Sequence, residues 1–284
     1  MGEYFFLNGK ILPASEAVLK ITDLALLRGF GIFDFMRTHR NVPFLMDRYL
    51  TRFFNSARLM ELEIPYGREK IASIILDLLE RNNIFEAGIR IVLTGGYTSN
   101  GYTPAEPNFF ILIEKINFPP ADYYKNGVKL FYYQHQRELS QIKSINYLSP
   151  IVLRNRISDA GAYDVLYHFN NHILEVSRSN FFIIRDQKII TPGDHVLRGI
   201  TRESVIEMAR GHFEVEERPV HVDELWGADE AFMTGTTKKV LPVVQVGDHK
   251  IGRGSPGLIT RKLMDMFREF EDSVVQSSKS PEER

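Results

Sequence analysis

Two adjacent prolines, Pro119 and Pro120, divide the sequence into two parts. Proline fixes its own φ angle and lacks a backbone N–H, so two in succession suit neither a helix nor a central strand. On both sides of them, apolar spacings typical of strands alternate with spacings typical of amphipathic helices. We therefore predict an α/β (α+β) fold with two domains, residues 1–118 and 127–284, joined by a linker at 119–126. A chain of 284 residues is long enough for each domain to have its own core.

The apolar pattern locates the individual elements. Asn8-Gly9, the strongest short turn signal, predicts a hairpin over Tyr4–Ile11. Strands are predicted at Phe30–Thr38, Gly88–Thr94, Asn108–Ile116, Val128–Gln134, Asp164–Phe169, Phe181–Arg185, Ala231–Met233 and Val243–Val246. Helices are predicted at Met46–Met60, Ile71–Arg81, Ser149–Ala160, Thr201–Gly211 and Gly257–Phe270. The polar residues 273–284 are predicted to form a frayed tail.

Composition restricts the kinds of function that fit. The 35 basic and 36 acidic residues give a net charge of -1, so no global field favours nucleic acid or a membrane surface. The absence of cysteine removes disulfides and thiolate chemistry, and it suits a reducing compartment, with the cytoplasm as the default. We expect no secretory leader and no membrane span, because no segment approaches ~20 apolar residues. The eight histidines include no zincin-like arrangement, so no metal site is predicted.

Lys143 is the candidate catalytic residue. It lies among apolar neighbours in Ile142-Lys143-Ser144-Ile145-Asn146-Tyr147-Leu148. Burial disfavours the ammonium form and lowers the pKa of a lysine, so that the neutral amine can attack a carbonyl. The alternative for a lone lysine is a side chain whose stem lies along apolar surface while its charged end stays in water.

Three further segments follow Lys143 in a fixed order. They are Ile173-Leu174-Glu175-Val176-Ser177-Arg178-Ser179-Asn180-Phe181-Phe182, Leu197-Arg198-Gly199-Ile200-Thr201-Arg202-Glu203 and Met233-Thr234-Gly235-Thr236-Thr237. Together they resemble the fold-type IV enzymes that depend on pyridoxal 5'-phosphate (PLP), the class IV aminotransferase family. That family includes branched-chain aminotransferases, D-amino acid aminotransferases and aminodeoxychorismate lyases. The resemblance extends from Arg28 to Val243 and implies a small α/β domain followed by a larger pseudo-barrel domain with flanking helices.

The resemblance implies which residues bind the ring of the cofactor. Lys143 matches the Schiff-base lysine of the family, which also carries the proton between substrate and cofactor. Glu175 matches the carboxylate that keeps the pyridine nitrogen protonated, and the alternative is a strand glutamate turned to solvent. Tyr147 matches a tyrosine of the branched-chain enzymes near the phenolic oxygen of the cofactor.

The phosphate of PLP needs positive charge and N–H donors. Arg52 lies where the family has its phosphate-binding arginine, with Arg48 and Arg58 as competitors and a solvated basic helix face as the alternative. Gly199-Ile200-Thr201 is expected to open a helix whose first amides suit phosphate oxygens, although an ordinary threonine N-cap also fits. By resemblance, the hydroxyl and amide of Thr236 reach the phosphate; composition alone predicts only a turn there.

The substrate residues are less well defined. The resemblance assigns the substrate carboxylate to the Gly235-Thr236-Thr237 turn, through the amide of Thr237. Phe33 offers apolar surface for an aliphatic side chain, or belongs to the core. Arg90 retains the arginine of the Tyr-x-Arg pair of branched-chain enzymes, without its tyrosine. Asp34 stands where aminotransferases often have glutamate and the lyases often have threonine, which favours transamination.

These residues predict transfer of an amino group between an aliphatic, branched-chain L-amino acid and 2-oxoglutarate. Aminodeoxychorismate lyase, which forms 4-aminobenzoate and pyruvate, is the first alternative and D-amino acid aminotransferase the second. A catalytically idle PLP carrier is a further alternative, and the presence of both Lys143 and Glu175 argues against it. The partners expected are a small amino acid, a 2-oxo acid and, because relatives are dimers, a second copy of the chain.

Overall fold

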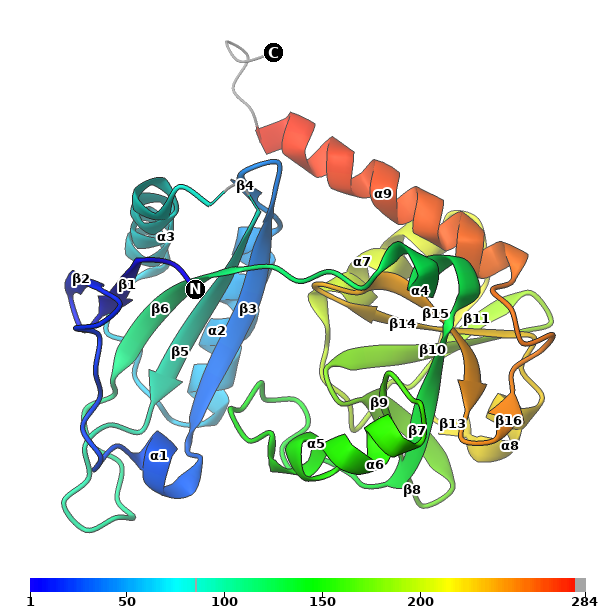
Figure 1. The fold of residues 1–284 in the computed structure, drawn as a ribbon, viewed down its shortest axis with the longest axis horizontal. Helices are drawn as coiled ribbons and strands as arrows, with labels where there is room; N and C mark the ends of the chain where they lie inside the picture. The colour runs from blue at the N-terminus through cyan, green and yellow to red at the C-terminus, as the bar shows by residue number, and fades with distance from the viewer. Residues whose placement is uncertain (85, 279–284) are drawn as a thin grey trace. The chain divides into compact units, whose positions relative to one another are not determined.

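The computed structural model describes residues 1–84 and 86–278, which form two compact units (Figure 1). The first unit contains residues 1–117 and 142–146 together with the end of the last helix, from Ser273; the second contains residues 118–141 and 147–272. These units differ from the predicted domains at residues 142–146 and at the end of the last helix, from Ser273, both of which were predicted to belong to the second domain. The segment 142–146 follows the prolines in sequence, but it belongs to the first unit because Ser144 forms a β-bridge with Ile32.

The first unit consists of a β-sheet and helices that pack against it. Its described residues form a six-stranded sheet in the order β2-β1-β6-β5-β3-β4. The strands are β1 (Tyr4–Leu7), β2 (Lys10–Pro13), β3 (Gly31–His39), β4 (Val42–Pro43), β5 (Ala87–Thr94) and β6 (Phe109–Lys115). The helices are α1 (Leu24–Arg28), α2 (Met46–Leu59) and α3 (Arg68–Asn82). The predicted hairpin about Asn8-Gly9 is confirmed as the antiparallel pair β1 and β2.

The spacing of the buried residues along α2 and α3 explains how these helices pack against the sheet. In α3, the buried side chains recur every three or four residues and so share one face: Ile71, Ile74, Ile75 and Leu78. That helix packs against β1 and β6, while α2 packs against β3. In α2 the buried positions Tyr49, Leu50, Phe53 and Ala57 form the corresponding face.

The second unit contains a closed ring of strands. The ring runs β10-β14-β15-β7-β8-β9 and closes where β9 pairs with β10. Its strands are β7 (Val128–Gln134), β8 (Asp164–Phe169), β9 (His172–Val176), β10 (Ser179–Arg185), β14 (Glu230–Gly235) and β15 (Lys239–Val246). The strands β11 (Lys188–Thr191), β12 (Val215–Glu217), β13 (Val220–His221) and β16 (His249–Lys250) extend the sheet. The larger, pseudo-barrel unit expected from the family resemblance is therefore present.

Apolar side chains fill the ring. Alternate residues of a strand point to the same side, so one set from each strand meets inside. The interior residues include Leu130, Leu166, Val176, Phe181, Met233 and Leu241. Helices of this unit are α4 (Ala121–Asn126), α5 (Leu148–Val152), α6 (Arg154–Asp159), α7 (Ile200–Ala209), α8 (Val222–Trp226) and most of α9 (Leu258–Ser278).

Three sequence predictions need correction. The predicted linker at 119–126 contains the short helix α4, because the chain resumes helical geometry directly after Pro120, which precedes its first residue. The single helix predicted at Ser149–Ala160 is two short helices, α5 and α6, separated at Leu153. The predicted frayed tail is helical up to Ser278, as part of α9, and residues 279–284 lie outside the described residues.

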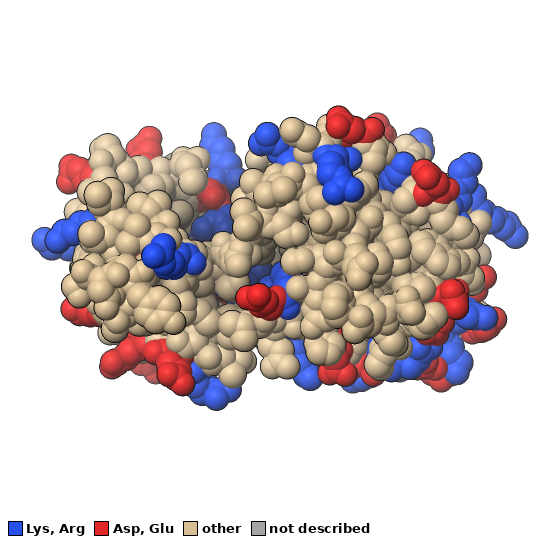
Figure 2. Space-filling view, turned by 90° about the horizontal axis from the view of Figure 1, so that it is seen from below, with Lys and Arg blue, Asp and Glu red and all other residues tan. Residues whose placement is uncertain are grey.

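Surface charge follows the balanced composition. On the face shown in Figure 2, acidic and basic side chains are interspersed rather than gathered into one field of a single sign. Within residues 1–84 and 86–278, no helix combines the length and apolarity that crossing a bilayer requires.

Candidate active site

The backbone of Lys143 is fixed by the first unit. The N–H of Phe33 donates to the carbonyl oxygen of Lys143 at 2.9 Å, and the N–H of Ile145 donates to that of Gly31 at 3.1 Å. The N–H of Lys143 in turn donates to Oγ of Ser56 on α2, at 3.4 Å. The segment therefore extends the sheet beyond β3 and holds Lys143 at its edge.

The side chain of Lys143 lies over an aromatic ring. Its Nζ is 4.6 Å from the centroid of the Phe33 ring, and the residue is half-buried rather than fully desolvated. Cζ of Arg90 lies 5.4 Å from the same ring and 5.0 Å from that of Phe35, while Nη2 of Arg90 is 2.7 Å from Oε1 of Glu114. The first unit thus brings the predicted residues Lys143, Phe33 and Arg90 together around one apolar ring, whose face attracts cations.

Arg52 is held by a buried carboxylate. Its Nε donates to Oδ2 of Asp34 at 2.9 Å and its Nη2 to Oδ1 at 2.6 Å, a bidentate pair. The Asp34 side chain is 0% exposed and that of Arg52 10% exposed, so the solvated basic helix face is wrong for this residue. Arg58, its competitor, makes an exposed contact with Asn55. Asp34 therefore fixes the direction of the Arg52 guanidinium.

Glu175 is buried and doubly hydrogen-bonded. The residue is 5% exposed, so the alternative of a solvent-facing glutamate is wrong. Nε of Arg137 donates to Oε1 at 2.7 Å, and the N–H of Leu197 donates to Oε2 at 2.9 Å. A further donation from Nη2 of Arg137 to the carbonyl oxygen of Ser140, at 2.8 Å, fixes the guanidinium. Both bonds to the carboxylate favour its ionised form.

Asn180 connects this carboxylate to the next strand and to α7. It lies opposite Glu175 in β9 on one side and opposite Thr234 in β14 on the other. Its Nδ2 donates to the carbonyl oxygen of Leu197 at 2.7 Å. A Cβ atom at Gly199 would lie only 2.1 Å from Oδ1 of Asn180. Any larger residue at position 199 would therefore displace the Asn180 side chain where the loop enters α7.

The start of α7 offers backbone donors. Gly199 is the N-cap, with φ of -73°, and no described side chain caps the helix, so the alternative of an ordinary threonine N-cap is wrong. Ile200 and Thr201 form its first turn, as expected, and Thr201 is 6% exposed. Nearby in the sheet, the buried Oγ1 of Thr234 lacks a hydrogen-bond partner among the described residues. An uncapped helix start and a buried hydroxyl without a partner suit a polar ligand.

The Gly235-Thr236-Thr237 segment is a tight turn, as predicted. Gly235 pairs with Lys239 across β14 and β15, which leaves three residues in the loop. The backbone of Lys239 has φ of 54°, in the left-handed region. A Cβ atom at Gly235 would approach Oγ of Ser179 to 3.0 Å, and that buried oxygen also lacks a partner within the described chain. The turn thus lies beside the start of β10, next to Asn180.

A buried lysine closes the same end of the barrel. Lys238 is 5% exposed, and burial lowers its pKa to about 8, with a further lowering by Arg178 and an opposing effect of Asp164. Asp164 begins β8 and accepts from Oγ of Ser177 at 2.5 Å. Its Oδ2 lies 3.9 Å from Nη2 of Arg178. These charged and polar side chains form a polar layer over the apolar interior.

Sequence reasoning missed two of these residues. Arg137 stands in a loop after β7 with no periodic signal, and its contact with Glu175 spans 38 positions. Lys238 follows the turn as the first of two lysines, a pattern that normally indicates solvent exposure. Tyr147, the remaining predicted residue, is half-buried and precedes the first residue of α5.

Known proteins resemble the chain over almost its whole length. The family model "Amino-transferase class IV" matches residues 31–246. A putative branched-chain-amino-acid aminotransferase from Methanocaldococcus jannaschii is 30% identical over 93% of this chain and 95% of its own length. A D-alanine aminotransferase from Bacillus licheniformis is 27% identical over 90% of this chain and 93% of its own length.

Solved structures agree with these sequence matches. The T.th. branched-chain amino acid aminotransferase, solved with pyridoxamine 5'-phosphate, superposes with a TM-score of 0.89. It is 25% identical, and the match covers 99% of this chain and 96% of that one. The matched region contains Lys143, Glu175, α7 and the Thr236 turn. The chain therefore belongs to the class IV aminotransferase family.

Proposed function

We propose that this class IV aminotransferase moves the amino group of an aliphatic, branched-chain L-amino acid to 2-oxoglutarate. The observation that carries the substrate proposal is the position of the Lys143 amine, 4.6 Å from the centroid of the Phe33 ring. An amine beside an aromatic wall suits a substrate whose side chain is apolar. The relative from Methanocaldococcus jannaschii, named as a putative branched-chain enzyme, supports the same substrate class.

PLP is the cofactor of this family, and the residues of the chain fit it. Nζ of Lys143 would attach it covalently, and the buried carboxylate of Glu175 would hold the proton on its pyridine nitrogen. The phosphate would be bound by Arg52, by the first amides of α7 at Ile200 and Thr201, and by Thr236. The fit rests on the uncapped start of α7 and on the buried hydroxyls of the neighbouring strands that lack partners among the described residues.

When bound, PLP supplies an electron-withdrawing ring that makes the α-proton of an amino acid acidic enough to remove. Once the substrate amine has displaced it from the cofactor, Lys143 would act as the general base and acid, taking the α-proton on Nζ and later giving it back. Arg137 and the N–H of Leu197 hold the carboxylate of Glu175 in place, because both donate to it. The amide of Thr237 would orient the substrate carboxylate, and Phe33 with Arg90 would line the side-chain pocket.

A donor screen tests the proposal. Purified holoenzyme with L-leucine and 2-oxoglutarate should yield glutamate, and a Lys143→Ala variant should yield none. The same screen includes D-alanine, because a D-alanine aminotransferase is among the relatives. It also includes aminodeoxychorismate, for the lyase alternative. Glutamate from D-alanine but not from L-leucine, or pyruvate from aminodeoxychorismate alone, would contradict the branched-chain proposal.

We further propose that the enzyme is a homodimer and acts in the cytoplasm. The family resemblance supports the dimer, and the absence of cysteine suits a reducing compartment. Light scattering during size-exclusion chromatography measures the assembly directly, and a mass of about 33 kDa, that of one chain, would contradict the dimer.

A further inference from the structure

The turn that follows β14 ends in a lysine with an unusual backbone. Thr236, Thr237 and Lys238 form the loop, and Lys239 closes it with φ of 54°. Non-glycine residues rarely adopt this left-handed conformation, because their Cβ atom then crowds the backbone. Besides its backbone pairing with Gly235, Lys239 makes side-chain contacts outside the loop.

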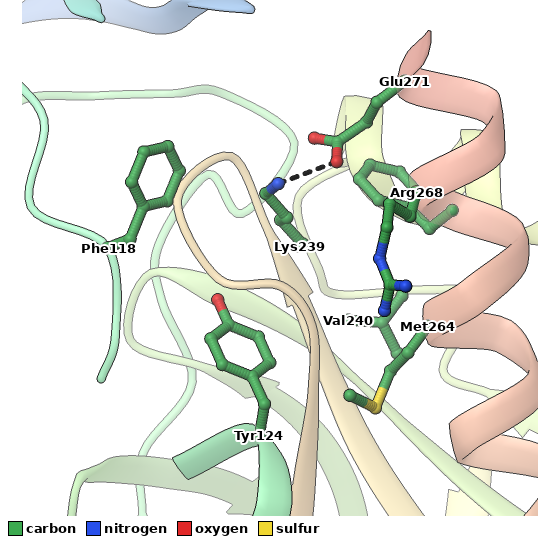
Figure 3. A pocket seen from close by; sticks show the side chains of 8 residues that line it. Phe118, Tyr124, Lys239, Val240, Met264, Arg268 and Glu271 are labelled. Carbon is green, nitrogen blue, oxygen red and sulfur yellow. Dashed lines mark hydrogen bonds and ion pairs between the residues drawn. The ribbon is translucent and has the colours of Figure 1, made fainter. Parts of the chain in front are cut away.

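The strongest of these contacts is an ion pair with Glu271 on α9. Nζ of Lys239 lies 2.8 Å from Oε2 of Glu271, as the dashed line in Figure 3 marks. The Glu271 side chain is 1% exposed and that of Lys239 31% exposed. A carboxylate so deeply buried requires a partner of opposite charge. Phe118 adds a second contact, since Nζ of Lys239 lies 5.5 Å from the centroid of its ring.

Lys239, the residue that closes the turn, and its neighbour Val240 border a cavity. The cavity has a volume of about 260 Å³, and its walls include Tyr124, Val240, Met264 and Arg268 (Figure 3). Tyr124 supplies one further tie, because its hydroxyl donates to the carbonyl oxygen of Lys238 at 3.2 Å. On the side of the cavity, the turn is therefore held by two polar contacts, Tyr124 to Lys238 and Lys239 to Glu271.

We propose that Lys239 and Glu271 are positioning residues, which hold the Thr236-Thr237 turn in the conformation that binds the cofactor phosphate and the substrate carboxylate. The roles of Thr236 and Thr237 rest on the proposed function. Neither member of the ion pair acts by touching the ligand. The pair fixes the backbone amides that do, and so acts through geometry.

The charge of Lys239 allows this role to be distinguished from simple attraction of anions. In a Glu271→Gln variant, the lysine loses its counter-charge, so direct attraction would make the turn bind an anion more tightly. Positioning predicts the opposite result, because the loosened turn spends less time in the binding conformation. The sign of the change in affinity therefore separates the two explanations.

The experiment uses holoenzyme of four forms: wild type, Glu271→Gln, the double variant Lys239→Met with Glu271→Gln, and Lys239→Arg. The double variant removes both charges, so it leaves no unpaired buried carboxylate even if a single variant folds poorly. The matched control is Glu214→Gln, which removes an exposed ion pair with Lys188 of similar length, 2.7 Å. Far-ultraviolet circular dichroism first establishes that each variant is folded.

Two measurements need no substrate: the rate of PLP release on dilution, and hydrogen exchange at the amides of residues 236–239. We expect PLP release to be roughly ten-fold faster in Glu271→Gln and in the double variant, the effect of weakening one hydrogen bond. We expect faster amide exchange confined to the turn, near wild-type behaviour in Lys239→Arg, and no change in the control. Unchanged or slower PLP release in both charge-removing variants would overturn the proposal.

The kinetic measurement tests the substrate part. We expect KM for the amino donor to rise roughly ten-fold while kcat at saturation changes less than about two-fold, because the turn binds the carboxylate but moves no proton. A roughly ten-fold fall in kcat with an unchanged KM would contradict this part of the proposal. If the wild-type protein transfers no amino group from any donor, the proposed function fails, while PLP release and amide exchange still decide whether the ion pair positions the turn.

Discussion

Replacing the buried Lys238 by methionine should change how stability depends on pH. The ordinary pKa of lysine is 10.5, and burial at the end of the barrel lowers the pKa of Lys238 to about 8. Between these values, the unfolded chain binds the lysine proton and the folded chain does not. The free energy of unfolding of the wild-type protein therefore receives a contribution that rises with pH from 8 to 10.5, because the folded state no longer has to bury a charge.

The size of this contribution follows from the two pKa values. Their difference corresponds to roughly 3 kcal/mol of destabilisation at pH 7, where the lysine is charged in both states. At pH 10 less than about 1 kcal/mol of it is left. In Lys238→Met the methionine side chain has a similar length and no charge, so the whole contribution is absent. The stability difference between variant and wild type should therefore shift by more than about 2 kcal/mol between pH 7 and pH 10.

Urea unfolding of the holoenzyme at pH 7, 8.5 and 10 measures this shift. The control is Lys125→Met, at an exposed position on α4 of the same unit. Burial also raises the pKa of Tyr132 and Tyr167 to about 12, which lowers stability above pH 10, but this effect is common to all three proteins and cancels in the differences. If the free energies of unfolding of Lys238→Met and wild type changed in parallel with pH, the inference that the buried charge of Lys238 destabilises the folded state would be refuted.

Three further changes test the site. Asp34→Asn leaves the guanidinium of Arg52 without its carboxylate, so urea unfolding should show a loss of about 3 kcal/mol, and a loss below about 1 kcal/mol would contradict a buried pair. Glu175→Gln should reduce kcat roughly 100-fold, equivalent to about 2.7 kcal/mol, while the absorbance of bound PLP persists; wild-type turnover would exclude its role at the pyridine nitrogen. Gly199→Ala drives a methyl group into the amide of Asn180, so the holoenzyme should lose about 1–3 kcal/mol in a thermal unfolding experiment, and an unchanged Tm would contradict the close approach.

Local sequence signals were sufficient for much of the fold. Asn8-Gly9 predicted its hairpin because that pair fits the left-handed angles of a tight turn. The apolar runs at β7 and β8 predicted those strands at their observed bounds. Gly199 correctly marked the start of α7, since glycine there allows the close approach to Asn180. In each case, the local sequence alone was enough to predict the element.

The parts that were not predicted depend on contacts between distant residues. Nothing near Arg137 indicates that its guanidinium meets Glu175, because closure of the barrel brings them together. Arg52 could be assigned a phosphate by resemblance, but not its partner Asp34, which lies on a different element. Lys238 has a polar local sequence and is buried only because its turn covers the end of the barrel. Tertiary structure, rather than local propensity, decides these cases.

Closure of the ring at β9 and β10 limits how the chain can change in length. Glu175 and Asn180 face one another across these two strands, and only Ser177 and Arg178 connect the strands. Successive strand residues point to opposite sides, so an insertion or deletion here that shifted the pairing of β9 with β10 by one residue would turn the carboxylate of Glu175 into the apolar interior. The longer loops elsewhere can gain or lose residues with little change in the free energy of unfolding. We therefore expect functional variants of this protein to differ in length at its loops, and never between these two positions.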